Sequence, residues 1–239
     1  RERMRDERTG APVPAIGDEA ENGGTHADRD HRNAEDHVRG YHRAAPYRGA
    51  MRVIEERKPA ATSSVPEAEL KKTEAGLVVE SEGWFVANAR DVSWIRSEER
   101  GQDTDFEGRQ EWTDLGFRIQ TLSPGQRGLY HGERGQEDFL AVSGECALVI
   151  EGEERRLKAW DFVHCPPWTK HTFVGAGDGP CVIVMAGSRA GGFEVVYAVN
   201  DVAAKHGASV LEETSNPDEA HTRFGQEERS AYSDGWLPS

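Results

Sequence analysis

Along residues 115–199, short apolar runs alternate with turn residues at short, regular intervals. The runs are rich in Val, Ile, Leu and Phe, and Gly, Pro or charged residues separate them. This spacing is typical of antiparallel hairpins in a sandwich or barrel. The predicted strands cover residues 115–122, 139–142, 146–150, 155–159, 160–164, 171–174, 181–186 and 193–199.

Further strands are predicted upstream at residues 77–80, 83–89 and 92–96, where β-branched and aromatic side chains gather. Between them and the regular pattern, residues 97–111 are polar and contain glycine, so we expect a long loop. A short helix near residues 67–72 would lead into the ordered part. Together these runs predict an all-β domain over residues 73–200.

The apolar period changes after residue 200. Asp201 is placed to cap a short helix that Gly207 ends. Pro217 predicts the first helical position of a second helix, with Glu219 placed for a capping box. We therefore expect residues 201–239 to form a helical and irregular extension, whose last aromatic residues pack back on the barrel or on a second subunit.

Residues 1–72 differ from the rest in composition. They hold 14 acidic and 14 basic side chains and no Trp, Phe or Cys. Such a segment buries too little apolar area to offset the entropy of ordering it, so we expect it to be disordered. It has no apolar core of a secretory signal, which favours a cytoplasmic protein.

Charge and cysteine content narrow the possible partners. The chain carries a net charge of −14, all of which lies after residue 72, where 29 acidic residues face 15 basic ones. So acidic a surface argues against nucleic acid and anionic membranes as partners. Three cysteines are too few for a disulfide framework and suit a reducing compartment. No apolar run is long enough to span a membrane.

Two stretches carry candidate chemistry. His131 and Glu133 lie two residues apart, so on a strand they point to the same face. Glu137 opens a new strand after a glycine-containing turn, and this strand could lie antiparallel to the first. His171 opens another strand after a Pro-Pro turn. Two imidazoles and two carboxylates that project into one barrel are a plausible set of ligands for a divalent metal.

The first stretch resembles the first motif of the cupin family. That motif is Gly, five residues, His-x-His, three or four residues, Glu, six residues, Gly. Gly125, His131, Glu137 and Gly144 fall on this spacing, and Glu133 stands where the second histidine is usual.

The second stretch resembles the second cupin motif, which is Gly, five residues, Pro-x-Gly, two residues, His. Pro166 and His171 fit it, whereas Trp160 and Trp168 occupy the two glycine positions. The resemblance covers about residues 75–200 and implies a cupin double-stranded β-helix, or jelly-roll barrel, with short C-terminal helices. It also implies a homodimer, because barrels of this family commonly pair through their outer sheets.

The resemblance further implies one divalent ion, Fe, Mn, Zn or Ni, held by His131, Glu137, His171 and Glu133. A face of two histidines and one carboxylate would also suffice, and Glu133 would then be a catalytic base or would support the ligands through hydrogen bonds. Candidate substrate-binding residues beside these ligands are Tyr130, Gln136 and Trp168.

Two functions remain open at this level. A metal-binding cupin could act on a small polar molecule as an oxygenase, isomerase or lyase, with an open metal position and Glu133 as the base. Alternatively, the barrel could bind or sense a small, sugar-like molecule without catalysis. The motifs specify the ligands and leave the reaction undefined.

Overall fold

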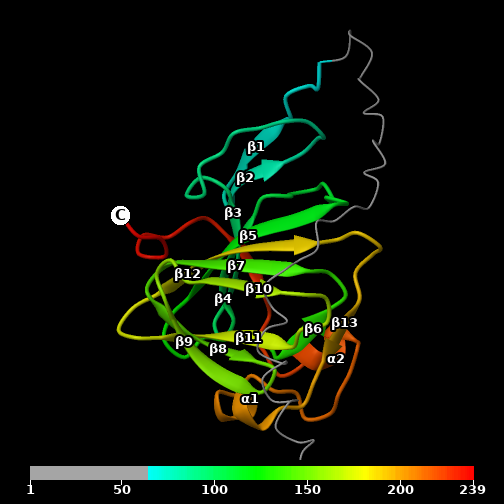
Figure 1. Cartoon of the computed structure of the whole chain (residues 1–239). Helices are drawn as coiled ribbons and strands as arrows, with labels where there is room; N and C mark the ends of the chain where they lie inside the picture. Colours follow the sequence, from blue (N-terminus) through cyan, green and yellow to red (C-terminus); the bar gives the residue numbers. More distant parts are fainter. Residues whose placement is uncertain (1–63) are drawn as a thin grey trace, which may run out of the picture. The chain divides into compact units, whose positions relative to one another are not determined.

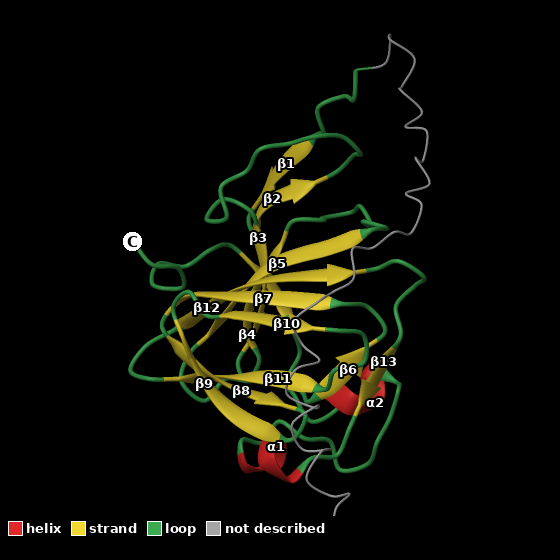
Figure 2. Cartoon of the chain, in the orientation of Figure 1, coloured by secondary structure: helices red, strands yellow, loops and turns green. Residues whose placement is uncertain are grey.

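The structure is a computed structural model that describes residues 64–239. These residues form fourteen strands and two helices of five residues each, which confirms the expected all-β class (Figure 1, Figure 2). Every ladder between the strands is antiparallel, as the predicted hairpins require.

One large sheet forms one wall of the barrel. Its seven strands are β3 (Ser93–Ser97), β4 (Gly101–Asp105), β5 (Leu115–Leu122), β7 (Glu137–Ser143), β10 (Phe162–Cys165), β12 (Cys181–Ser188) and β14 (Glu228–Ser230). They lie in the order β10-β7-β12-β5-β4-β3-β14, so neighbours in the sheet are often distant in the sequence.

A second sheet forms the opposite wall. Its five strands are β6 (His131–Glu133), β8 (Glu145–Ile150), β9 (Glu153–Lys158), β11 (His171–Ala176) and β13 (Val195–Tyr197), and they lie in the order β13-β6-β11-β8-β9. A separate two-stranded sheet pairs β1 (Leu70–Thr73) with β2 (Gly76–Val79).

The two large sheets face each other (Figure 2), and the main core contains side chains from both of them. Leu122, Phe139 and Ile183 of the seven-stranded sheet pack in one buried cluster with Leu148 and Phe173 of the five-stranded sheet. Each such side chain stabilises the fold by about 1.5–3 kcal/mol when it leaves water. Burial between two antiparallel sheets is the arrangement that the jelly-roll prediction requires.

The predicted strands after residue 114 are present, and β5 has the predicted bounds. The suggestion that the strand of Glu137 pairs with the strand of His131 is wrong, because β6 and β7 belong to different sheets. β7 pairs with β10 and β12, whereas β6 pairs with β11 and β13. The turn between β6 and β7 therefore carries the chain from one wall of the barrel to the other.

Three upstream expectations are wrong. The expected loop over residues 97–111 contains β4, whose pairing with β3 and β5 overrides a polar, strand-poor sequence. The expected strand over residues 83–89 forms only an isolated bridge, from Trp84 to Glu67. The helix expected at residues 67–72 is replaced by β1, which gains ladder hydrogen bonds from β2.

The prediction of a disordered segment over residues 1–72 falls largely on residues 1–63, which lie outside the described residues. For the last residues of this segment the prediction is wrong, because Leu70–Thr73 form β1. The domain boundaries at residues 73 and 200 stay a prediction, as does the homodimer.

Two short helices follow the barrel. Asn200, rather than the expected Asp201, caps α1 (Asp201–Lys205), and its side chain accepts hydrogen bonds from two backbone N–H groups. The second helix, α2 (Pro217–His221), begins at the proline as predicted. Ala220 of α2 packs in a buried cluster with Val195 of β13.

The C-terminal end packs back on the barrel, as expected. β14 pairs with β3 at the edge of the seven-stranded sheet. The rings of Tyr232 and Trp236 lie 6.0 and 5.2 Å from that of the fully buried Trp94. Neither helix in residues 64–239 combines the length and the apolarity that crossing a membrane requires.

Candidate metal centre

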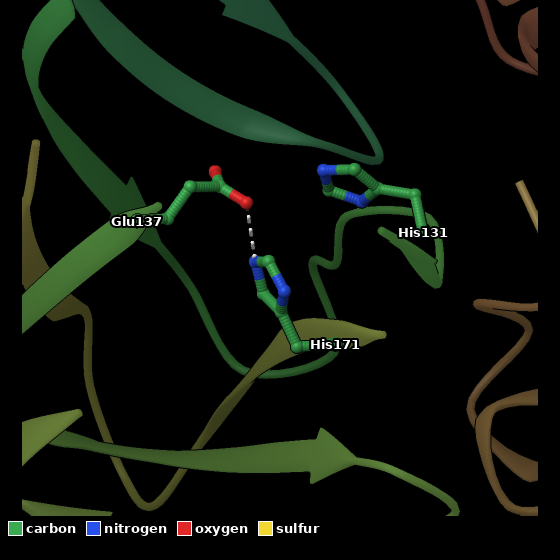
Figure 3. A group of neighbouring side chains, drawn as sticks. All are labelled: His131, Glu137 and His171. Carbon is green, nitrogen blue, oxygen red and sulfur yellow. Dashed lines mark ion pairs between the residues drawn. The ribbon is translucent and has the colours of Figure 1, made fainter. Parts of the chain in front are cut away.

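The two motif histidines meet on adjacent strands of the five-stranded sheet. His131 on β6 is the register partner of His171 on β11, and their ring centroids lie 5.1 Å apart. Glu137 enters from the start of β7 in the opposite sheet (Figure 3). The two walls of the barrel thus bring together side chains that neither sheet contains alone.

Each histidine is oriented by a hydrogen bond to a backbone carbonyl. The Nδ1 of His131 lies 2.7 Å from the carbonyl oxygen of Leu129, and that of His171 lies 3.0 Å from the carbonyl oxygen of Thr169. A carbonyl only accepts, so each Nδ1 carries the proton and donates it. The Nε2 of each ring is then left to bind a metal, and a carbonyl partner on the other nitrogen is usual for ligand histidines.

The donor set fits a divalent ion. Ligand atoms of His131, Glu137 and His171 all lie within 4.8 Å of one another. Two atoms that bind one ion at about 2.1 Å are at most about 4.2 Å apart, so small side-chain rotations would complete the site. Two imidazoles and one carboxylate suit Fe(II), Mn(II), Zn or Ni.

Glu133 lies beside this group and is not part of it. Its Oε1 is 3.4 Å from the Nε2 of His131. Burial raises the pKa of Glu133, but the hydrogen bond and the charge of His131 outweigh this, so the pKa lies below its usual range. For His131 itself, burial lowers the pKa, and the same contact with Glu133 outweighs it and raises the pKa.

Glu137 and His171 have shifted pKa values of a different kind. Burial, followed by the charge of Glu133, raises the pKa of Glu137 to about 7. Burial, followed by the charge of His131, lowers the pKa of His171 to about 4. The side chain of His171 is only 2% exposed, and the ring of Phe139 packs 4.9 Å from it. At neutral pH His171 is therefore a neutral imidazole, the form that binds a metal.

A cavity of about 530 Å³ opens beside these residues, and Glu133, Glu137 and Phe139 line it. Most of its remaining wall comes from the seven-stranded sheet and the segment between β4 and β5. The volume is within the range of small-molecule sites. Of the three candidate metal ligands, Glu137 lines this cavity.

The three predicted substrate-binding residues lie elsewhere among the described residues. Tyr130 is buried in a cluster with Val149 and Ala203. Gln136 is exposed and donates to Asp138, and the exposed Trp168 donates its backbone N–H to the carbonyl of Glu133. None of the three lines the cavity. Their role in substrate binding stays a prediction.

The cavity contains charged residues that the sequence pattern did not identify. β5 was predicted as a strand from its apolar residues, and Arg118 of this strand lines the cavity together with Phe117. Arg118 pairs in register with Met185, a core residue. Strict alternation was the available signal, since Arg118 shares a face with Leu122, which is fully buried.

Comparison with known proteins agrees with the motifs. Residues 118–187 match the family model described as a cupin domain. No curated protein matches the sequence.

Several solved structures are similar to part of this chain. The proposed sugar phosphate isomerase of Acidithiobacillus ferrooxidans is 23% identical over 35% of this chain and 54% of its own, with a TM-score of 0.32. The polyketide cyclase RemF of Streptomyces resistomycificus is 14% identical over 44% of this chain and 79% of its own, with a TM-score of 0.39. An RmlC-like cupin of Shewanella frigidimarina is 21% identical over 41% of this chain and 84% of its own, with a TM-score of 0.35. This chain thus spans about half the length of the first of these proteins.

The family model covers the strands that carry both sequence motifs, from Arg118 on β5 to Gly187 on β12. The antiparallel two-sheet fold brings the candidate ligands of both motifs, His131, Glu137 and His171, together. Residues 118–187, which carry both motifs, match the cupin domain that the motifs resemble.

Proposed function

We propose that this cupin is a metal-dependent enzyme that acts on a small polar molecule, as an oxygenase, isomerase or lyase. His131, Glu137 and His171 hold one divalent ion, and Glu133 is the catalytic base. One geometric observation carries the proposal, the grouping of three donor atoms beside a separate carboxylate. Donor atoms of His131, Glu137 and His171 lie within 4.8 Å of one another, and a second carboxylate, that of Glu133, lies next to His131 and outside the group.

When bound, a divalent ion supplies Lewis acidity that polarises an oxygen of the substrate. The residues of the chain then provide orientation and proton transfer. Glu133 has a pKa below its usual range, so its carboxylate is ionised at neutral pH and able to accept a proton. Its nearest partner is His131, at 3.4 Å, and a proton on His131 must leave when the imidazole binds a metal.

The test begins with elemental analysis of the purified protein, where we expect one divalent ion per chain. Oxygen uptake and product formation are then measured with sugars, keto acids and aromatic diols. Glu133→Gln should retain the metal and lose about 10²- to 10⁴-fold in turnover, the usual contribution of a general base.

Glu154→Gln is the matched control, because Glu154 also contacts a histidine, His206 at 2.8 Å, yet lies outside the cavity lining. Saturable binding without turnover of any binding compound would favour the alternative, a small-molecule binding or sensing protein. Absence of metal under every growth supplement would contradict the proposal itself.

A further inference from the structure

Arg118 extends the candidate site beyond the metal ligands. In the seven-stranded sheet it forms one register row with Met185 on β12 and Phe139 on β7. Two strand spacings separate its backbone from that of Phe139 by about 10 Å. Glu137 lies two residues before Phe139 and therefore on the same face. The guanidinium and the candidate ligand Glu137 thus lie on one wall of the cavity.

The guanidinium of Arg118 has unused hydrogen-bond donors. It carries five N–H groups. Its nearest acid is Asp103, whose Oδ1 is 3.7 Å from the Nε, beyond hydrogen-bond distance. Within residues 64–239 no group accepts a hydrogen bond from it, and its side chain is 52% exposed to the cavity and solvent. A ligand acceptor would therefore meet a free fork of donors.

The other arginines of the cavity are already engaged. Arg189 donates to both carboxylate oxygens of Glu107, each at 2.6 Å, and to the carbonyl of Trp112. Arg229 pairs with Asp105. Arg100 pairs with Glu227 at 2.5 Å. Arg118 is thus the cavity-lining arginine of the described chain that has no hydrogen-bonded acid partner.

A glycine, Gly187, keeps the space beside Glu137 open. Glu137 is the register partner of Gly187, and Gly187 is the partner of Gly116. A Cβ on Gly187 would lie 3.7 Å from the Cγ of Glu137, which places it on the ligand side of the sheet. A Cβ on Gly116 would lie 2.9 Å from the Nε of Arg189. Gly187 therefore leaves room beside Glu137, whereas the side chain of Arg189 occupies the space over Gly116.

We propose that Arg118 binds the carboxylate of a substrate whose other end places an oxygen at the metal centre. This inference rests on the proposed function and names the class of its substrate, a small hydroxy or keto acid. One free arginine fork matches one carboxylate in a bidentate pair. A phosphate, with more negative charge, would be repelled by the neighbouring carboxylates of Asp103, Glu133 and Glu137.

The test measures binding rather than turnover. Calorimetry with Mn²⁺-loaded protein compares glycolate, 3-hydroxypropanoate and 4-hydroxybutanoate with the corresponding amides and with inorganic phosphate. We expect at least one acid to bind, and its amide to bind about 10- to 100-fold more weakly, as loss of a charge-assisted pair predicts. Arg118→Gln should weaken the acid by the same factor and leave the amide unchanged.

Two further variants make the result specific. Arg155→Gln removes an exposed arginine of β9 that pairs with Glu153, and it should leave acid binding unchanged. Gly187→Leu fills the space beside Glu137 with the guanidinium intact, and it should abolish acid binding. Equal binding of acid and amide, tighter binding of phosphate, unchanged affinity in Arg118→Gln or no binding of any acid at millimolar concentration would overturn the inference.

The same titrations on EDTA-treated protein separate this inference from the proposed function. There we expect weaker binding of the acid that still depends on Arg118. If the wild-type chain binds no metal but retains Arg118-dependent acid binding, the metal enzyme is wrong and the carboxylate site is correct. If the wild-type chain binds metal and turns over a neutral compound while Arg118→Gln has no effect, the metal enzyme is correct and the carboxylate site is wrong.

Discussion

The two walls of the barrel contribute unlike parts to the site. The five-stranded sheet supplies His131 and His171, each held by a hydrogen bond from its Nδ1 to a backbone carbonyl. The seven-stranded sheet supplies Glu137, the neighbouring Gly187 and the guanidinium of Arg118, which has no hydrogen-bonded acid partner. The five-stranded sheet thus orients the two candidate nitrogen ligands, while the seven-stranded sheet contributes charged side chains that line the cavity.

The difference also appears in burial. The side chain of His171 is 2% exposed, whereas that of Arg118 is 52% exposed. A ligand that binds a metal benefits from a single orientation, because its lone pair must point at the ion. A substrate-binding wall needs unpaired polar groups and room, which a tightly packed core lacks. A barrel with two unlike walls provides both within one small domain.

Removal of a histidine from the rigid wall should have the largest effect. In His171→Ala we expect metal affinity to fall by at least about 100-fold, more than loss of a residue that only supports a ligand. Calorimetric titration of the metal-free protein measures this. His164→Ala is the control, because His164 is exposed and pairs with Asp138 outside the cavity lining. Equal metal affinities of His171→Ala and His164→Ala would show that His171 is not a metal ligand.

The second-largest effect should be a loss of metal affinity on acidification, because Glu137 on the opposite wall becomes protonated. The pKa of Glu137 is about 7, so below that pH the carboxyl is protonated and must release a proton to bind a metal. The pKa of His131 also lies above its usual value, and it too must lose a proton. Metal affinity should therefore fall as the pH falls through 7, by at least about tenfold from pH 8 to pH 6.

His171, with a pKa of about 4, stays neutral across this interval and adds nothing to the slope. Titrations at several pH values test the prediction, with Glu137→Gln as the comparison. That variant should bind metal weakly throughout and with a flatter pH dependence, because one titrating ligand is gone. An affinity that is constant from pH 6 to pH 8 in the wild-type protein would contradict this account.

The smallest effect concerns the connection between the two walls. Trp160 lies in the turn from β9 to β10, with a φ of 76° and a relative exposure of 74%. A side chain in this left-handed conformation is strained, and glycine is not. Trp160→Gly should therefore stabilise the protein by about 1 kcal/mol, measured by urea denaturation. Trp160→Ala, which keeps a Cβ, should gain less, and equal gains would mean that the ring, not the backbone, is unfavourable.

Several features of this protein are determined by the sequence alone. Residues two apart on a strand share a face, so His131 and Glu133 had to lie together, and they contact at 3.4 Å. The spacing of the two motifs placed His131, Glu137 and His171 in one predicted site, and their ligand atoms converge within 4.8 Å. Local spacing is sufficient here because strand alternation is a property of the backbone.

Other features were decided by the tertiary structure. The polar residues of β4 have no strong strand preference, and only neighbours distant in the sequence complete its ladders. β5 divides its length between two environments, because Leu122 lies in the dry core whereas Phe117 and Arg118 line the charged cavity. Which of Glu133 and Glu137 joins the histidines, and whether Arg118 is free to bind a ligand, depend on how the two sheets face each other. That packing is set by contacts between strands distant in the sequence, which no local pattern records.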